Sequence, residues 1–302
     1  MRPLSAARGH TTGVTDGTRL TLTEECTMGL QINHNVMAMN AYRNLAVTQG
    51  DLSKSLEKLS SGLRINRAAD DAAGLVISEK LRSQTNGLGV AVRNAQDGIS
   101  VVQTAEGALT ETTSILQRMR DLTVQAQNTG ATDTTAQAAA QSEVNQLVSE
   151  LDRIASTTKF GSKNLLDGSY TGASGVFLVG ANGTAGETIG VGILTMSSAA
   201  TGLNVTALSV TATTALASID AALSAVGTQR GNLGAIQNRL EHTIANLNVA
   251  KENLAASESR IRDTDMASEM TNFTRSQILQ QAGTAMLSQA NSLPQGVLKL
   301  LG

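Results

Sequence analysis

Apolar residues recur every seven positions along the C-terminal part of the chain. They are Ile219, Val226, Leu233, Leu240, Leu247, Leu254 and Ile261. A period of seven keeps side chains on one slowly drifting stripe of an α-helix, the pattern by which long helices wind around each other. The spacing therefore predicts one helix over 219–261, about 60 to 65 Å long, that packs lengthwise against a partner helix.

The N-terminal half carries a second stripe in two parts. The first part is Leu45, Leu52, Leu56, Leu59 and Leu63, and after a polar interruption the stripe resumes at Leu88, Val92, Ala95, Ile99, Val102, Leu109 and Leu116. We predict that the second part belongs to a helix that starts near Asp71 and ends near Asn128, where Asn-Thr-Gly forms a stop signal. A shorter helix with an apolar face over 141–154 is expected to fold back on it and end near Ser156.

Residues 168–210 differ from both arms, because they are rich in Gly, Thr, Ser and Val with almost no charge. Asn182 and Gly183, between two apolar runs, are a hairpin signal because both residue types tolerate positive φ. The stretch 203–210 fits either a strand or an irregular crossing. The predicted fold class is therefore mainly α: a long antiparallel α-helical coiled-coil bundle with a small β-hairpin region at the outer tip. A plain antiparallel coiled coil explains the same pattern.

Composition narrows the classes of function. Charged residues make up 16% of the chain and the net charge is -2, so copies of the surface repel each other little and association is favoured. No stripe of Lys and Arg is available for phosphates, which argues against nucleic acid as a partner. No run of eighteen apolar residues is present, so we expect no membrane insertion.

The usual signs of a catalytic or metal site are missing from the sequence. His10, His34 and His242 have no ligand spacing such as HExxH, and Cys26 is the only cysteine. No GxSxG, Walker A or Rossmann glycine pattern stands in a strand-to-helix setting. We therefore predict that the protein is not an enzyme and has no catalytic, cofactor-binding or metal site.

Long segments at both ends resemble bacterial flagellin. At the N-terminal end these are MGLQINHNVMAMNAYRNL (28–45), LEKLSSGLRINRAADDAAGLVISEKLRSQ (56–84) and RNAQDGISVVQTAEGALTETTSILQRMRDLTVQA (93–126). At the other end they are LGAIQNRLEHTIANLNVAKENLAASESRIRDTDMASEM (233–270) and QAGTAMLSQANSLPQGVLKLLG (281–302). Together they cover most of the chain from Met28, in the order expected of the family.

The resemblance implies a domain organisation in matched halves. Residues 28–70 and 263–302 would form the terminal-helix domain, 71–167 and 211–262 the helical rod domain, and 168–210 a short variable tip. Residues 1–27 are polar and without periodicity. We expect them to be a disordered extension, and we expect filaments to be built from chains that begin at or near Met28.

A polar cluster interrupts the N-terminal stripe where two of these segments join. It consists of Arg64, Asn66, Arg67, Asp70 and Asp71. One interpretation is that Asp70 or Asp71 caps the following helix, since a carboxylate there accepts hydrogen bonds from free backbone amides. The other is a join between inner and outer helical segments, where the arginines pair with carboxylates. The two interpretations are compatible.

Self-association is the expected function. The end segments have apolar faces with little local core, so they should order only when copies pack together. A contact that does not close on itself generates a helical filament. The resemblance implies a structural subunit that polymerises into the flagellar filament for bacterial swimming motility. The candidates for subunit packing are Leu45, Leu52, Leu56, Leu59, Leu63, Arg118, Arg120, Leu233, Leu240, Leu247, Leu254, Ile261, Met270 and Phe273.

The resemblance also implies partners and a location. Besides copies of itself, these partners are a flagellar export chaperone, the export gate, the filament cap and the hook-filament junction proteins. The implied location is the extracellular filament, reached without a cleaved signal peptide.

A host partner is implied as well, the Toll-like receptor that senses flagellin. The positions that match its contacts are Arg118, Leu122 and Glu143. Asp121 and Thr123 depart from the common family residues. The structural alternative is that Arg118 and Arg120 contact neighbouring subunits and that Leu122 is buried between subunits.

Two other classes of protein are alternatives to a filament subunit. A hook-filament junction protein shares the helical ends but would form only a short ring. A coiled-coil regulator or adhesin would give a discrete dimer or tetramer.

Overall fold

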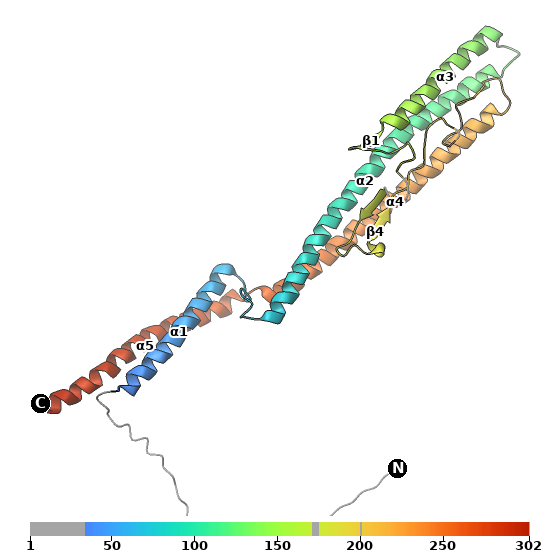
Figure 1. Ribbon diagram of the computed structural model, residues 1–302. Helices are drawn as coiled ribbons and strands as arrows, with labels where there is room; N and C mark the ends of the chain where they lie inside the picture. The colour runs from blue at the N-terminus through green and yellow to red at the C-terminus, as the bar shows by residue number, and fades with distance from the viewer. Residues whose placement is uncertain (1–33, 171–174, 200, 302) are drawn as a thin grey trace, which may run out of the picture. The chain divides into compact units, whose positions relative to one another are not determined.

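The computed structural model describes residues 34–170, 175–199 and 201–301 (Figure 1). The predicted extension over 1–27 lies outside the described residues. The chain divides into two compact units. We call residues 57–269 the rod unit, and residues 34–56 together with 270–301 the terminal unit.

Long helices make up most of the described chain. They are α1 (Val36–Ser61), α2 (Ala72–Ala126), α3 (Thr134–Thr157), α4 (Ala215–Arg262) and α5 (Met266–Leu301). The strands are short and pair in twos: β1 (Lys159–Phe160) with β2 (Lys163–Asn164), and β3 (Val176–Leu178) with β4 (Thr188–Gly190). A 3₁₀ turn, η2 (Ala185–Glu187), precedes β4. The predicted fold class, mainly α with a small hairpin, is confirmed.

In the rod unit, α2 and α4 lie side by side and run in opposite directions, while α3 folds back along α2 (Figure 1). The period of seven correctly predicted α4 as one helix. Ile219, Val226, Leu233, Leu240 and Leu247 of the stripe are all buried. Leu254 and Ile261, nearer the end of α4, are half-buried. The stripe therefore stabilises the rod chiefly by packing against α2.

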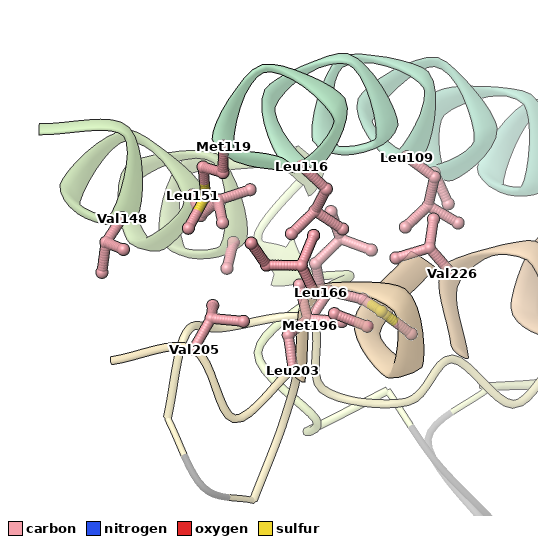
Figure 2. Close-up of a cluster of buried hydrophobic side chains, with 14 of the residues drawn as sticks. Leu109, Leu116, Met119, Val148, Leu151, Leu166, Met196, Leu203, Val205 and Val226 are labelled. Carbon is pink, nitrogen blue, oxygen red and sulfur yellow. The ribbon is translucent and has the colours of Figure 1, made fainter. Parts of the chain in front are cut away.

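The core of the rod unit is built from three helices and the irregular chain that covers them. Figure 2 shows these side chains meeting between the helices. Dense packing of this kind supplies most of the stability of a helical bundle. The labelled members come from α2 (Leu109, Leu116, Met119), from α3 (Val148, Leu151), from α4 (Val226) and from the connecting segments (Leu166, Met196, Leu203, Val205).

Carboxylates at the N-caps fix where two helices begin. Asp71 accepts a hydrogen bond from the backbone N–H of Gly74 at 2.9 Å, and Asp133 accepts one from Ala136 at 2.8 Å. Each bond satisfies an amide that has no partner within its helix. The predicted cap of α2 is thus confirmed at Asp71.

The predicted hairpin forms, but it occupies a different place from the one expected. Phe177 pairs with Ile189, and Gly183 adopts a positive φ of 68° in the connecting loop. The hairpin packs on α2, where Asn94 Nδ2 donates to the carbonyl of Leu178 at 3.0 Å and the ring of Phe177 lies over Gly98. The hairpin therefore lies against the side of the rod. The outer end of the rod is formed by the turn between α2 and α3 instead (Figure 1).

The stretch 203–210 is an irregular crossing, held by a side chain of α3 and by backbone hydrogen bonds to residues 197–199, which α3 also anchors. Gln141 of α3 accepts from the N–H of Val210 and donates to the carbonyl of Leu208, both at 2.8 Å. Asp152 accepts from the N–H and the hydroxyl of Ser198, each at 2.8 Å. These bonds supply the partners that a β-ladder would otherwise give to the backbone.

In the terminal unit, α1 and α5 lie alongside each other (Figure 1). Asn35 Nδ2 donates to the carbonyl of Ala290 at 2.7 Å, and Leu45 faces Gly283. Among the described side chains of this unit, only Ser55 and Ala290 are buried.

Within the described helices of the whole chain, none combines the length and apolar character needed to cross a membrane.

Candidate self-association faces and connector site

Large apolar side chains are left exposed along α1 and α5. Because large apolar side chains left exposed in numbers on a monomer commonly mark a site of interaction, we take these two helices as candidates for self-association. We call these residues the apolar terminal faces. Between 44% and 67% of each is exposed: Val36, Met37, Met39, Tyr42, Val47 and Leu56 on α1, and Met266, Met270, Ile278, Leu279, Met286 and Leu293 on α5.

A groove of about 510 Å³ runs between α1 and α5. Met37 and Leu45 line it from α1, and Leu279, Gly283 and Met286 line it from α5. A Cβ atom at Gly283 would lie 3.3 Å from Leu45 Cδ1, so glycine lets the two helices approach at this point. The groove shows that the two helices fill the space between them only partly.

The predicted packing residues fall into three groups by burial. Leu233, Leu240 and Leu247 are buried in the rod core, so they have no surface left for a second chain and stabilise the subunit itself. Leu45, Leu52, Leu59, Leu63, Leu254, Ile261 and Phe273 are half-buried. Leu56 and Met270 are exposed, as are Arg118 and Arg120.

The prediction missed most of the apolar terminal faces. Val47, Ile278 and Met286 lie off the period-seven stripe, so a coiled-coil seam does not include them. A helix that needs only one apolar stripe for its own partner has no use for apolar residues on other faces. Their presence off the stripe was the signal in the sequence.

Two ion pairs join α2 to its neighbours near the outer part of the rod. Arg118 Nη2 lies 2.7 Å from Glu143 Oε1 of α3, with both side chains substantially exposed. Arg120 Nε lies 2.9 Å from Asp220 Oδ1 of α4, and this hydrogen bond raises the pKa of Arg120. Leu122, the third predicted receptor contact, is only 3% exposed and belongs to the core of the rod. It is buried within its own chain, so a partner cannot touch it directly.

The predicted polar cluster forms a connector between α1 and α2. Arg67 Nε and Asn66 Nδ2 both donate to Glu57 Oε1 at 2.8 Å. The carboxylate of Asp70 accepts from the backbone amides of Arg67, at 2.9 Å, and Asn66, at 3.2 Å, and these bonds lower its pKa. Glu57 likewise raises the pKa of Arg67. Asp70 thus shapes the loop, while Asp71 caps the helix.

The same connector is tied to the end of α4. Leu63 forms an antiparallel bridge with Asp263, with Arg64 N donating to the carbonyl of Arg262 at 2.6 Å. The guanidinium of Arg64 donates to the carbonyl of Ile261, rather than to a carboxylate as predicted. The guanidinium of Arg262 in turn pairs with Glu79 of α2. The cluster therefore ties the connector between α1 and α2 to the C-terminal end of α4.

Taken together, a rod with a complete core and two terminal helices with unfilled apolar faces define a self-associating structural protein. Residues 32–171 match the family of the bacterial flagellin N-terminal helical region, and residues 216–301 match the bacterial flagellin C-terminal helical region. The chain belongs to the bacterial flagellin family. It is a structural subunit of the extracellular flagellar filament that serves motility, and not an enzyme.

Relatives from several bacteria align with this chain over nearly their full length. Flagellin of Bacillus subtilis is 50% identical over 90% of this chain and 100% of its own. Flagellin of Halalkalibacterium halodurans is 53% identical over 89% and 99%, and the flagellar filament 33 kDa core protein of Treponema phagedenis is 49% identical over 89% and 99%. A crystal structure of Bacillus cereus flagellin covers 51% of this chain and 88% of its own, at 29% identity and a TM-score of 0.43.

Proposed function

We propose that the apolar terminal faces are the contacts through which copies of this chain join in the filament core. The supporting observation is their exposure, 44% to 67% for twelve large apolar side chains on α1 and α5. Burying them against other copies removes apolar area from water, at about 25 cal/mol per Å². That gain offsets the ordering of helices that have little core of their own.

The experiment introduces one charge at a time into these faces. Val47→Glu on α1 and Ile278→Glu on α5 are compared with Gln49→Glu and Gln277→Glu, which place the same charge at exposed polar positions of the same helices. A carboxylate buried in an apolar contact is costly unless it is paired. We expect the first two variants to raise the critical concentration for assembly by about tenfold or more, equivalent to 1.4 kcal/mol, and the controls to change it little.

Assembly is measured by sedimentation and electron microscopy of seeded protein, beside a version that lacks 266–302. Long filaments from the controls alone would support the proposal. Filaments from all variants would contradict it. Short rings from the unaltered chain would favour a junction protein, and discrete oligomers would favour a regulator or adhesin.

The same faces suggest how the subunit is handled before assembly. We propose that an export chaperone covers α5, since Ile278, Leu279 and Met286 would otherwise be exposed to other chains. The chain would then leave through the export gate, and the cap and hook-filament junction proteins would contact its terminal helices. Co-purification of a chaperone that is lost with Ile278→Glu, together with the intact mass of filament protein, tests these steps.

We further propose that the outer part of the rod is a ligand of the Toll-like receptor that senses flagellin. The exposed pair of Arg118 and Glu143 offers one positive and one negative group on adjacent helices, 2.7 Å apart. Leu122 would act from beneath, since its side chain packs in the core and holds that part of α2 in place.

Receptor activation by three single variants tests this second role. Arg118→Ala and Glu143→Ala remove the two exposed groups, while Arg153→Ala removes another exposed arginine, which pairs with Glu150 within α3. We expect activation to fall by about tenfold for the first two, because each also leaves its partner without a counter-charge. An equal fall for Arg153→Ala, or no fall for the first two, would contradict the assignment.

A further inference from the structure

The methionines of the described chain fall into two classes. Met119 and Met196 are 0% and 2% exposed in the core of the rod unit. The other five are between 46% and 63% exposed, and all of them lie on the two terminal helices: Met37, Met39, Met266, Met270 and Met286.

Three of the exposed methionines line hollows in these helices. Met37 and Met286 face the groove between α1 and α5 from opposite sides. Met270 lines a second hollow of about 490 Å³ on α5, together with Ile278 and Leu279. The thioether sulfurs therefore lie in the surfaces that the proposed contacts would bury.

We propose that these five methionines are a reversible oxidation site that decides whether a free subunit can assemble. The proposal rests on the proposed function of the apolar terminal faces. Hydrogen peroxide transfers one oxygen atom to the sulfur: an S–O bond forms, the O–O bond breaks, and one water leaves. The sulfur is oxidised and the peroxide is reduced. A sulfoxide reductase with a thiol donor reverses the step.

Oxidation changes what the faces can bury. Met is a flexible apolar side chain that fits irregular surfaces, and its sulfoxide is polar and accepts hydrogen bonds. Burying that oxygen without a donor costs free energy on every contact that includes it. Because Met119 and Met196 are shielded from the reagent, the rod keeps its fold. Oxidation thus stops assembly without unfolding the subunit, and assembly in turn shields the sulfurs.

The test treats the full chain with hydrogen peroxide, as free subunits and as filaments. Peptide mass spectrometry locates the added oxygen, and sedimentation measures the critical concentration. In free subunits we expect oxidation at the five exposed methionines and not at Met119 or Met196. We expect a critical concentration about tenfold higher or more, reversed by methionine sulfoxide reductase. In filaments we expect the same five sites to react much more slowly. Equal oxidation in both states, or unchanged assembly after oxidation, would overturn the proposal.

Two sets of variants assign the effect to these residues. In the first, all five exposed methionines become leucine, a substitution of similar volume that peroxide does not oxidise. In the second, Met119→Leu and Met196→Leu alter only the buried pair. We expect the first set to assemble with or without peroxide, and the second to remain sensitive. Sensitivity of the first set would overturn the proposal.

A third variant tests the proposal even if the set of leucine variants folds poorly. Met286→Gln carries a polar group of similar length, and it should raise the critical concentration while circular dichroism shows an intact rod. Normal assembly of this variant would count against the proposal. If Val47→Glu and Ile278→Glu block assembly but oxidised protein assembles, only the oxidation site fails. If the charged variants assemble normally, the proposed function itself fails.

Discussion

At the scale of single residues, two glycines of α2 show how the surroundings decide whether a change to alanine stabilises or destabilises the fold. A Cβ atom at Gly74 would collide with the carboxylate of Asp71 and lie 2.7 Å from Ile65 Cδ1. Asp71 caps the helix and Ile65 is buried, so neither neighbour moves without loss. At Gly107, nothing lies within 4 Å of the same atom.

We therefore predict opposite effects of alanine at these two positions. Gly107→Ala should raise the free energy of unfolding by about 0.5 to 1 kcal/mol, because alanine loses less backbone entropy in a helix. Gly74→Ala should lower it by about 1 to 3 kcal/mol, through overpacking and a disturbed cap. Urea unfolding followed by circular dichroism measures both. A stabilising Gly74→Ala would mean that the first turn of α2 has room which the structure does not show.

At the scale of elements, one side chain holds the end of the crossing at 203–210. Gln141 satisfies both the carbonyl of Leu208 and the N–H of Val210. Gln141→Leu keeps the volume but leaves both backbone groups without this partner. We expect a loss of about 1 to 3 kcal/mol and faster hydrogen exchange at 208–210. Gln146→Leu, at an exposed position of the same helix, is the control. Equal exchange in both variants would show that Gln141 does not hold the crossing.

The elements also show how far the sequence could predict this fold. Period-seven spacing and stop signals depend on neighbours along the chain, so α2, α3 and α4 could be placed from the sequence. The hairpin could be predicted too, because Asn182 and Gly183 act locally. Its position could not, since it depends on Phe177 meeting Gly98 some eighty residues away in sequence. The course of 203–210 could not be predicted for the same reason: its side-chain partner Gln141 comes from a helix far away in sequence.

For the candidate site, the sequence predicted residue types better than roles. Asp71 is the cap, and Arg67 pairs with a carboxylate, as the charges indicated. Arg64 binds a backbone carbonyl, which no charge pattern could indicate. Leucines on one heptad stripe look alike in sequence, yet Leu240 is fully buried and Leu254 half-buried. Only the packing of α2 and the hairpin decides between them.

At the scale of the whole molecule, stability is unevenly distributed. The rod unit has a core from α2, α3, α4 and the segments that cover them, whereas the described part of the terminal unit buries only Ser55 and Ala290. Helices with no core of their own are marginal in water, because packing rather than propensity supplies most of their stability. Regions of low contact density open most readily.

Hydrogen exchange of free subunits and of filaments should reveal this difference directly. In free subunits, we expect amides of 36–56 and 270–293 to exchange at least about a hundredfold faster than those of 101–122, because opening them costs far less than unfolding the rod. In filaments, the same two segments should become as protected as the rod, since copies bury the apolar terminal faces. Val47→Glu should keep the free-subunit pattern at every protein concentration. Strong protection of α1 and α5 in free subunits would mean that the two helices are stable as a pair. Assembly would then join helices that are already folded, instead of ordering them.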